Sequence, residues 1–209
     1  MKILNLYAGI GGNRKLWGNN HEITAVEINE NIAKVYSDNY PDDLVIVGDA
    51  HEYLQNHFKE FDFIWSSPPC QTHSSFRRNI GVRFRGVKPI YPDMRLYQEI
   101  VFLQNHASEL GVLWAVENVK PYYKYLIEPT VILQRHPIWS NFKIGDKEFD
   151  TEKLRGVQIP QLEKIHGYDL RNYKLPNKRQ VLRNCVNSEL GLYVLESAII
   201  EQQKEMEVR

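Results

Sequence analysis

Short apolar runs alternate with amphipathic stretches along the first 119 residues of this chain. Each run is four to seven residues long and is bounded by glycine, proline or polar turn residues, which is the pattern of buried strands. We therefore predict five strands, at Ile3–Tyr7, His21–Glu27, Leu44–Val47, Phe61–Trp65 and Val112–Val116.

The stretches between these runs have helical spacing. Ile32, Tyr36 and Tyr40 recur on one face of a predicted helix, and Pro41 ends the pattern. The longest candidate has Pro92 near its start and Gly111 after its end. We predict helices at 13–17, with Asn13 as its cap, and at 29–40, 52–58, 92–110 and 187–205.

This alternation predicts an α/β fold, with a mostly parallel sheet and helices on both faces. Residues 143–179 are polar, contain several glycines and prolines and show no clear period, so we expect a small loop-rich lobe there. The chain therefore divides into a main domain (1–142), this lobe (143–179) and a C-terminal segment (180–209) that returns to the main domain.

Length and composition favour a single domain of 209 residues, and 43% hydrophobic residues suffice for a sizeable core. No apolar run approaches the roughly 20 residues that span a membrane, and the N-terminus has no signal-peptide layout. The two cysteines lie far apart in the sequence, so a disulfide framework is not expected. We expect a cytoplasmic protein with no membrane partner.

Charge is distributed unevenly, although the net charge is zero. Residues 19–62 contain ten acidic and two basic side chains, a balance of −8, whereas residues 77–95 contain six basic and one acidic, a balance of +5. The last third adds further arginines and lysines. A one-sided basic surface of this kind favours a polyanionic partner, although solvated loops remain an alternative.

A glycine-rich turn, residues 7–12 (Tyr-Ala-Gly-Ile-Gly-Gly), follows the first predicted strand. Glycines let the backbone approach a ligand closely, and such a turn before a helix is typical of nucleotide binding. Glu27 ends the second strand and Asp49 follows the third, so both carboxylates lie at the same sheet edge. An ordinary turn with surface carboxylates is the alternative to an adenosine-containing ligand.

A second turn, residues 66–71 (Ser-Ser-Pro-Pro-Cys-Gln), follows the fourth predicted strand. Its prolines cannot continue the strand, so Cys70 is presented at the carboxyl edge of the sheet, where open α/β folds bind ligands. A thiolate there would be a nucleophile, whereas most cysteines are core residues. His73 is a base or, more commonly, a structural residue, and no histidine or cysteine pair has metal-ligand spacing, so we expect no metal site.

A third motif, Glu117-Asn118-Val119, follows the fifth predicted strand, beside the cysteine turn. A carboxyl group at that position can act as an acid or as a hydrogen-bond donor, and burial would raise its pKa and keep it protonated near neutral pH. Pairing with a loop lysine or arginine is the structural alternative.

The three motifs together resemble the cytosine carbon-5 DNA methyltransferase family, in order and in setting. The resemblance covers residues 3–119 well, including Asp93-Met94-Arg95-Leu96, and residues 180–200 more loosely, through Arg183-Asn184-Cys185-Val186. It implies a Rossmann-like S-adenosylmethionine-dependent methyltransferase fold, with catalysis and cofactor binding in residues 1–142 and a reduced target-recognition region in residues 143–179.

The resemblance also implies the site residues. Cys70 would add to carbon 6 of a flipped cytosine, Glu117 would bind ring N3, and Arg135, in Gln134-Arg135-His136, would contact cytosine or phosphate. The cofactor S-adenosyl-L-methionine would be bound by residues of the three motifs and of the C-terminal segment: Tyr7, Gly9, Gly11, Gly12, Glu27, Asp49, Pro68 and Asn184. Double-stranded DNA would be bound by the mobile loop that follows Cys70: Gln71, Ser74, Arg77, Arg78, Arg83 and Arg85.

Four departures from the family pattern are visible. Asn5 stands where an acidic residue is usual, and Arg183 replaces a glycine. The arginine-rich signature expected after Glu117-Asn118-Val119 is not recognisable, so Gln134-Arg135-His136 is the nearest candidate, and the recognition region is short for an independent domain. A compact monomer of phage or mobile-element type, in a restriction-modification or other setting, fits this size, with short specificity or a separate specificity chain. The alternatives are a tRNA methyltransferase of the same fold and a non-catalytic binding relative; a dinucleotide oxidoreductase leaves the cysteine and glutamate motifs unexplained.

Overall fold

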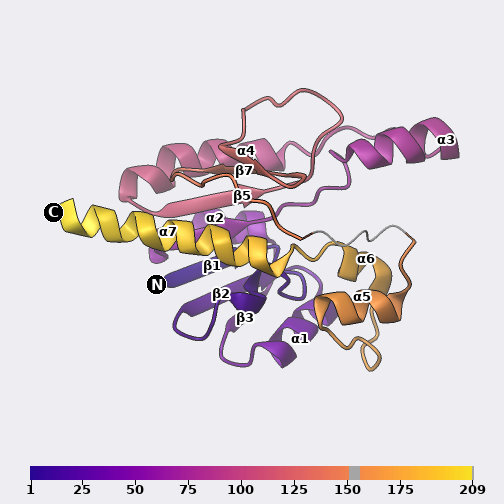
Figure 1. The fold of residues 1–209 in the computed structure, drawn as a ribbon, viewed down its shortest axis with the longest axis horizontal. Coiled ribbons are helices and arrows are strands. Elements are labelled where there is room, and N and C mark those ends of the chain that lie inside the picture. The colour runs from indigo at the N-terminus through magenta and orange to yellow at the C-terminus, as the bar shows by residue number, and fades with distance from the viewer. Residues whose placement is uncertain (151–155, 209) are drawn as a thin grey trace.

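A computed structural model describes residues 1–150 and 156–208 of the chain. Its centre is a seven-stranded sheet of order β3-β2-β1-β4-β5-β7-β6 (Figure 1). The first five strands are parallel and the last two are antiparallel to their neighbours. The strands are β1 (Lys2–Leu6), β2 (Glu22–Glu27), β3 (Leu44–Val47), β4 (Phe63–Ser66), β5 (Leu113–Glu117), β6 (Val131–Leu133) and β7 (His136–Ser140). The predicted α/β fold with a mostly parallel sheet is confirmed.

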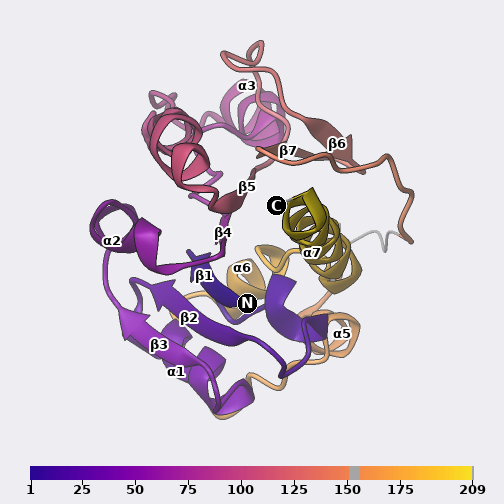
Figure 2. The same ribbon diagram turned by 90° about the vertical axis from the view of Figure 1, so that its left-hand side faces the viewer.

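Helices cover both faces of the sheet (Figure 2). Because side chains alternate along a strand, Leu4 and Leu6 of β1 pack on one face and Ile3 on the other. The face of Leu4 is covered by α2 (Ala50–His57) and α4 (Arg95–Phe102), and the face of Ile3 by α7 (Ser188–Val208). The remaining helices are α1 (Glu30–Asn39), α3 (Arg83–Arg85), α5 (Ile159–His166) and α6 (Lys178–Arg183).

Two predicted helices differ in detail. Residues 13–16 form a short 3₁₀ helix, and the Asn13 amide bonds Asn5 in the interior instead of capping a helix. The long helix predicted from Pro92 begins at Arg95 and continues through π and 3₁₀ turns to Leu110. Gly111 then ends it in the left-handed conformation, as predicted.

The hairpin β6–β7 was not predicted. Only Gln134 and Arg135 separate its strands, and Gln134 adopts a positive φ of 59° that the turn requires. β7 pairs with β5, opposite Glu117. The hairpin therefore brings its tip to the carboxyl edge of the parallel strands.

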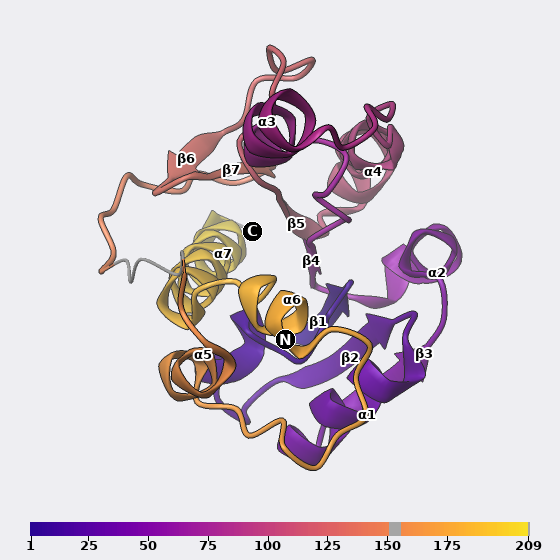
Figure 3. The same ribbon diagram turned by 90° about the vertical axis from the view of Figure 1, so that its right-hand side faces the viewer.

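The region predicted as loop-rich contains α5, and α6 crosses the expected boundary at residue 179. Leu162 and Leu182 of these helices are fully buried with Ile10 of the glycine turn and Val35 of α1. The two helices therefore pack beside the end of β1 (Figure 3). In the described part of the chain, none of the helices combines the length and apolar character needed to cross a membrane.

Candidate active site

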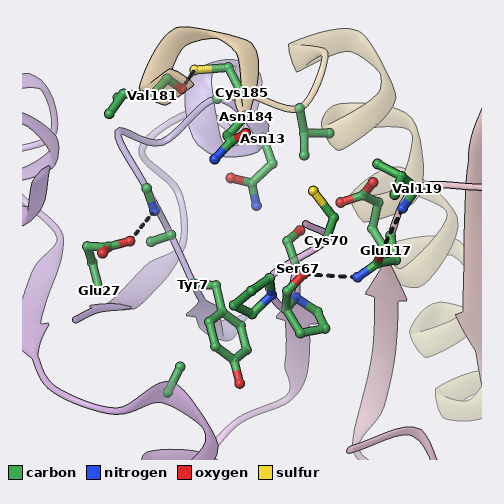
Figure 4. Close-up of a pocket in the computed structure, with 18 of the residues that line it drawn as sticks. Tyr7, Asn13, Glu27, Ser67, Cys70, Glu117, Val119, Val181, Asn184 and Cys185 are labelled. Carbon is green, nitrogen blue, oxygen red and sulfur yellow. Dashed lines mark hydrogen bonds between the residues drawn. The ribbon is translucent and has the colours of Figure 1, made fainter. Parts of the chain in front are cut away.

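The glycine turn at the end of β1 is held by Glu27. One carboxylate oxygen accepts the Gly9 amide at 3.0 Å and the other accepts the Asn29 amide at 2.9 Å (Figure 4). Burial raises the pKa of Glu27, and these backbone hydrogen bonds oppose that rise. The residue predicted to bind a ribose thus also fixes the turn before any ligand arrives.

The two faces of the glycine turn differ. At Gly9 a Cβ would meet no atom within 4 Å, so the backbone there borders open space. At Gly12 a Cβ would lie 2.9 Å from the Cβ of Cys185, and the Gly11 carbonyl accepts hydrogen bonds from the hydroxyls of Tyr40 and Tyr168. The turn is therefore open toward a ligand and closed against the C-terminal segment.

Asp49 follows β3 and caps α2. Its Oδ1 accepts the backbone amides of His51 and Glu52, and its Oδ2 lies 3.6 Å from Nη1 of Arg95. The predicted contact with an adenine amino group stays a prediction, and the capping role is an additional one.

A fully buried carboxylate, Glu99 of α4, connects three of the loops that form the site. It accepts the Tyr7 hydroxyl of the glycine turn and lies 3.0 Å from Nδ1 of His51 at the start of α2. Its other oxygen accepts the Ser66 hydroxyl of the cysteine turn at 2.7 Å. The hydrogen bond to Glu99 raises the pKa of His51, and Tyr7 has a positive φ of 55°, which costs energy in a residue with a side chain.

We expect Glu99→Gln to lower the free energy of unfolding by about 2 to 3 kcal/mol, because a carboxylate that accepts three hydrogen bonds becomes a neutral amide. A raised His51 pKa stabilises the fold fully below the unfolded value of about 6.5, and this contribution is lost as pH rises through the folded pKa. The destabilisation should therefore be larger at pH 6 than at pH 9 in urea titrations.

Glu196→Gln is the matched control for this prediction, because Glu196 is exposed on α7. It should change stability by less than about 0.5 kcal/mol. Equal effects of the two substitutions, or no dependence on pH, would contradict the role of the buried network.

The cysteine turn places Cys70 beside Glu117. The Asn118 side chain donates to the Pro68 carbonyl at 2.9 Å, which ties the turn to the end of β5 (Figure 4). Burial, and then the nearby charge of Glu117, raises the pKa of the Cys70 thiol to about 11, while Arg135 lowers it. In the ligand-free protein Cys70 is therefore a protonated thiol at neutral pH.

His73, three residues after Cys70, is buried, and its Nδ1 lies 2.5 Å from the Tyr123 hydroxyl. Burial lowers its pKa, so the imidazole is neutral at neutral pH. These contacts match the structural interpretation of this histidine.

Glu117 is buried at the end of β5, and its partner is His136, the first residue of β7. Oε1 of Glu117 lies 2.5 Å from Nδ1 of His136. The partner is thus a histidine rather than the lysine or arginine considered from sequence.

A cavity of about 400 Å³ connects these parts, a size typical of small-molecule sites. Eleven of the predicted site residues line it: Tyr7, Gly9, Gly12, Glu27, Asp49, Pro68, Cys70, Gln71, Glu117, Arg135 and Asn184. Gly11 is not among the lining residues, and its carbonyl accepts hydrogen bonds from Tyr40 and Tyr168. The structure also adds lining residues that sequence reasoning did not assign, among them Ser67, Arg95 and His136.

The remaining predicted residues lie on an arm, residues 76–91, that extends from the body at α3 (Figure 1). Arg78, Arg83 and Arg85 are exposed there, and Arg77 is half-buried. Phe84 is 80% exposed and Tyr91 is 94% exposed. Ser74, at the base of the arm, borders a smaller pocket with Arg77 and Arg78.

The cavity fits S-adenosyl-L-methionine in its donor set. The open backbone at Gly9 provides the space for close approach, and Glu27 and Asp49 place carboxylates at two successive strand ends. Cys70 and Glu117 line the same cavity, next to where the cofactor would lie.

Comparison with known families gives one match. Residues 1–85, less than half of the chain, match the family of C-5 cytosine-specific DNA methylases. The match includes the glycine turn and the cysteine turn and supports the family resemblance over those residues, whereas Glu117 lies outside it. No curated protein matches the sequence significantly.

Comparison with solved structures shows the fold. The methyltransferase EhMeth of Entamoeba histolytica is 13% identical with a TM-score of 0.53, and the alignment covers 97% of this chain and 98% of that one. A DNMT2 variant of Spodoptera frugiperda is 25% identical, with a TM-score of 0.43 and coverage of 72% and 53%. An Escherichia coli prophage protein described as a DNA modification methyltransferase is 21% identical, with a TM-score of 0.39. The alignment covers 59% of this chain and 33% of the prophage protein.

Proposed function

We propose that this chain, whose residues 1–85 match the C-5 cytosine-specific DNA methylase family, methylates carbon 5 of cytosine in duplex DNA. One observation carries the proposal: Cys70 and Glu117 line a single cavity with the glycine turn and its carboxylate Glu27. A nucleophile, an acid and a cofactor turn at one sheet edge are the parts that this reaction needs.

The bound S-adenosylmethionine would supply the electrophilic methyl group. Tyr7, Gly9, Gly12 and the carboxylates Glu27 and Asp49 would hold it, and Pro68 and Asn184 line the same cavity. The remaining steps depend on the side chains that would surround the cytosine ring.

Cys70 would lose its thiol proton to solvent and form a bond from Sγ to carbon 6 of the cytosine, while Glu117 holds a proton at ring N3 to take up the developing negative charge. Carbon 5 thereby becomes nucleophilic and accepts the methyl group. Loss of the carbon-5 proton to a base then lets the carbon–sulfur bond break, which restores the aromatic ring and frees Cys70.

Arg135 would assist the first step. It opposes the rise in the Cys70 pKa that burial and Glu117 produce, so it favours the thiolate that attacks. A positive charge at this position has the right sign for a nucleophile that must ionise inside a cavity.

The base would have to leave the duplex, because Cys70 and Glu117 must reach a ring face and an edge that stacking and pairing cover. The arm supports duplex DNA as the partner, since its exposed arginines suit phosphates. Residues 143–179 would add little sequence recognition, because Leu162 and Tyr168 are buried against the glycine turn. This arrangement supports short specificity or a separate specificity chain.

Methyl transfer to duplex DNA and to tRNA, measured side by side with radiolabelled S-adenosylmethionine, tests the proposal. We expect incorporation into duplex DNA, and bisulfite sequencing of that DNA should report the target. Incorporation into tRNA alone would overturn the choice of DNA. Cofactor binding without transfer to either nucleic acid would overturn the catalytic function in favour of a binding protein.

A further inference from the structure

The hairpin tip, residues 134–136, delivers two side chains to the active site. β7 pairs with β5 so that Glu117 lies opposite Ile138, and the hairpin turn then returns the chain toward the cavity. Arg135 and His136 both line the cavity that contains Cys70. Arg135 lowers the pKa of Cys70, while His136 bonds Glu117. Adjacent residues thus serve the two different reacting groups.

The contact between His136 and Glu117 is short and sheltered. Nδ1 of His136 lies 2.5 Å from Oε1 of Glu117, and the two side chains are only 14% and 7% exposed. A hydrogen bond to a carboxylate in such surroundings is stronger and more directional than one at the surface. It removes much of the freedom of a glutamate side chain, which has three rotatable bonds.

We propose that His136 is a positioning residue for Glu117. Its Nδ1 holds Oε1 and thereby leaves Oε2 to carry the proton toward ring N3 of the cytosine. The inference rests on the proposed function, because it assigns a role in that reaction. It goes beyond it in assigning the orientation of the acid to a histidine of the hairpin, which acts through its hydrogen bond to Glu117.

The side chains that face this pair limit the alternatives. Cys70 interacts electrostatically with both Glu117 and Arg135. On the other side of the tip, Arg135 and His136 border a second pocket whose other charged lining residues are Lys15, Asp146, Lys147, Glu148, Asp150 and Glu189. Arg135 acts on the thiol rather than on the carboxyl. His136 is therefore the described side chain with a hydrogen bond to the Glu117 carboxyl group.

Two variants of His136 test the role. His136→Ala should lower kcat by about 10- to 100-fold, because a misplaced acid loses the alignment that the reaction needs. KM for DNA and for S-adenosylmethionine should change less than about twofold, because the lost hydrogen bond joins His136 to Glu117 and not to either substrate. His136→Asn should restore most of kcat, because its amide nitrogen stands near the position of Nδ1 and can donate the same hydrogen bond.

His57→Ala is the matched control. His57 forms the same kind of bond, from Nδ1 to Oε1 of Glu60 at 2.8 Å, but on the surface, with the two side chains 38% and 61% exposed. Its removal should leave kcat unchanged. A kcat of His136→Ala equal to that of the wild type would overturn the inference while the proposed function stands, as would failure of His136→Asn to recover activity at an unchanged melting temperature.

A readout independent of turnover separates the two claims. In spectra of protein labelled with ¹⁵N-histidine, the Nδ1 resonance of His136 should shift when Glu117 is replaced by alanine. If the wild type methylates no nucleic acid, the proposed function fails, and this shift still reports whether His136 holds Glu117. An unshifted resonance would overturn the inference whatever the activity.

Discussion

Replacing Cys70 with alanine should lower methyl transfer by at least about 10³-fold, because it removes the thiol that forms the bond to carbon 6. The other thiol of the cavity, Cys185, lies on the C-terminal segment and donates to the Val181 carbonyl. The same change should abolish the covalent adduct that we expect between the wild type and DNA containing 5-fluorocytosine in the presence of S-adenosylmethionine. Gel electrophoresis under denaturing conditions measures the adduct directly. Cys70→Ser keeps the shape of the side chain and serves as the control for folding.

The same thiol has a reactivity that can be measured without any nucleic acid. With a pKa of about 11, the ligand-free protein should react slowly with iodoacetamide at pH 7, and the rate at Cys70 should rise about tenfold per pH unit until the thiolate dominates. Arg135→Ala should slow the reaction further, because Arg135 lowers that pKa. Peptide mapping separates Cys70 from Cys185, and fast alkylation of Cys70 at neutral pH would contradict its protonated state.

Glu117→Gln should lower kcat by about 10²- to 10⁴-fold, the range for losing a positioned acid. The glutamine amide can still donate a hydrogen bond to N3, but it has no acidic proton to transfer to that nitrogen. Cofactor affinity, measured by calorimetry, should stay within about twofold, because the carboxylates that face the cofactor turn are Glu27 and Asp49. A loss of cofactor affinity as large as the loss of kcat would move Glu117 out of the acid role.

The five parallel strands were predictable because each is an apolar run bounded by turn residues. β6 and β7 were not, since Val131–Leu133 is only three residues long and β7 contains Pro137 in an otherwise short apolar run. α5 was also missed: Ile159, Leu162 and Ile165 recur every three residues, but the helix is only eight residues long and Leu162 is its one buried residue. Short elements that are stabilised by tertiary contacts leave little pattern in the sequence.

The site divides in the same way. Cys70 and Glu117 stand in dense motifs directly after strands, so their meeting at one sheet edge could be inferred from topology. Glu99 and His136 stand alone in the sequence, and only the packing of α4 and the hairpin brings them to the site. One signal was available: Asp49 with Glu52 three residues later is a helix-start pattern, and Asp49 does cap α2.

The closing of the glycine turn by distant residues has a consequence for biosynthesis. Gly11 and Gly12 are translated more than 150 residues before their partners Tyr168 and Cys185. A nascent chain that stops before residue 168 can form the first strands of the sheet and still lacks the wall behind the turn. Ligand binding should therefore begin only after residues 168–185 have been translated and have packed against the turn.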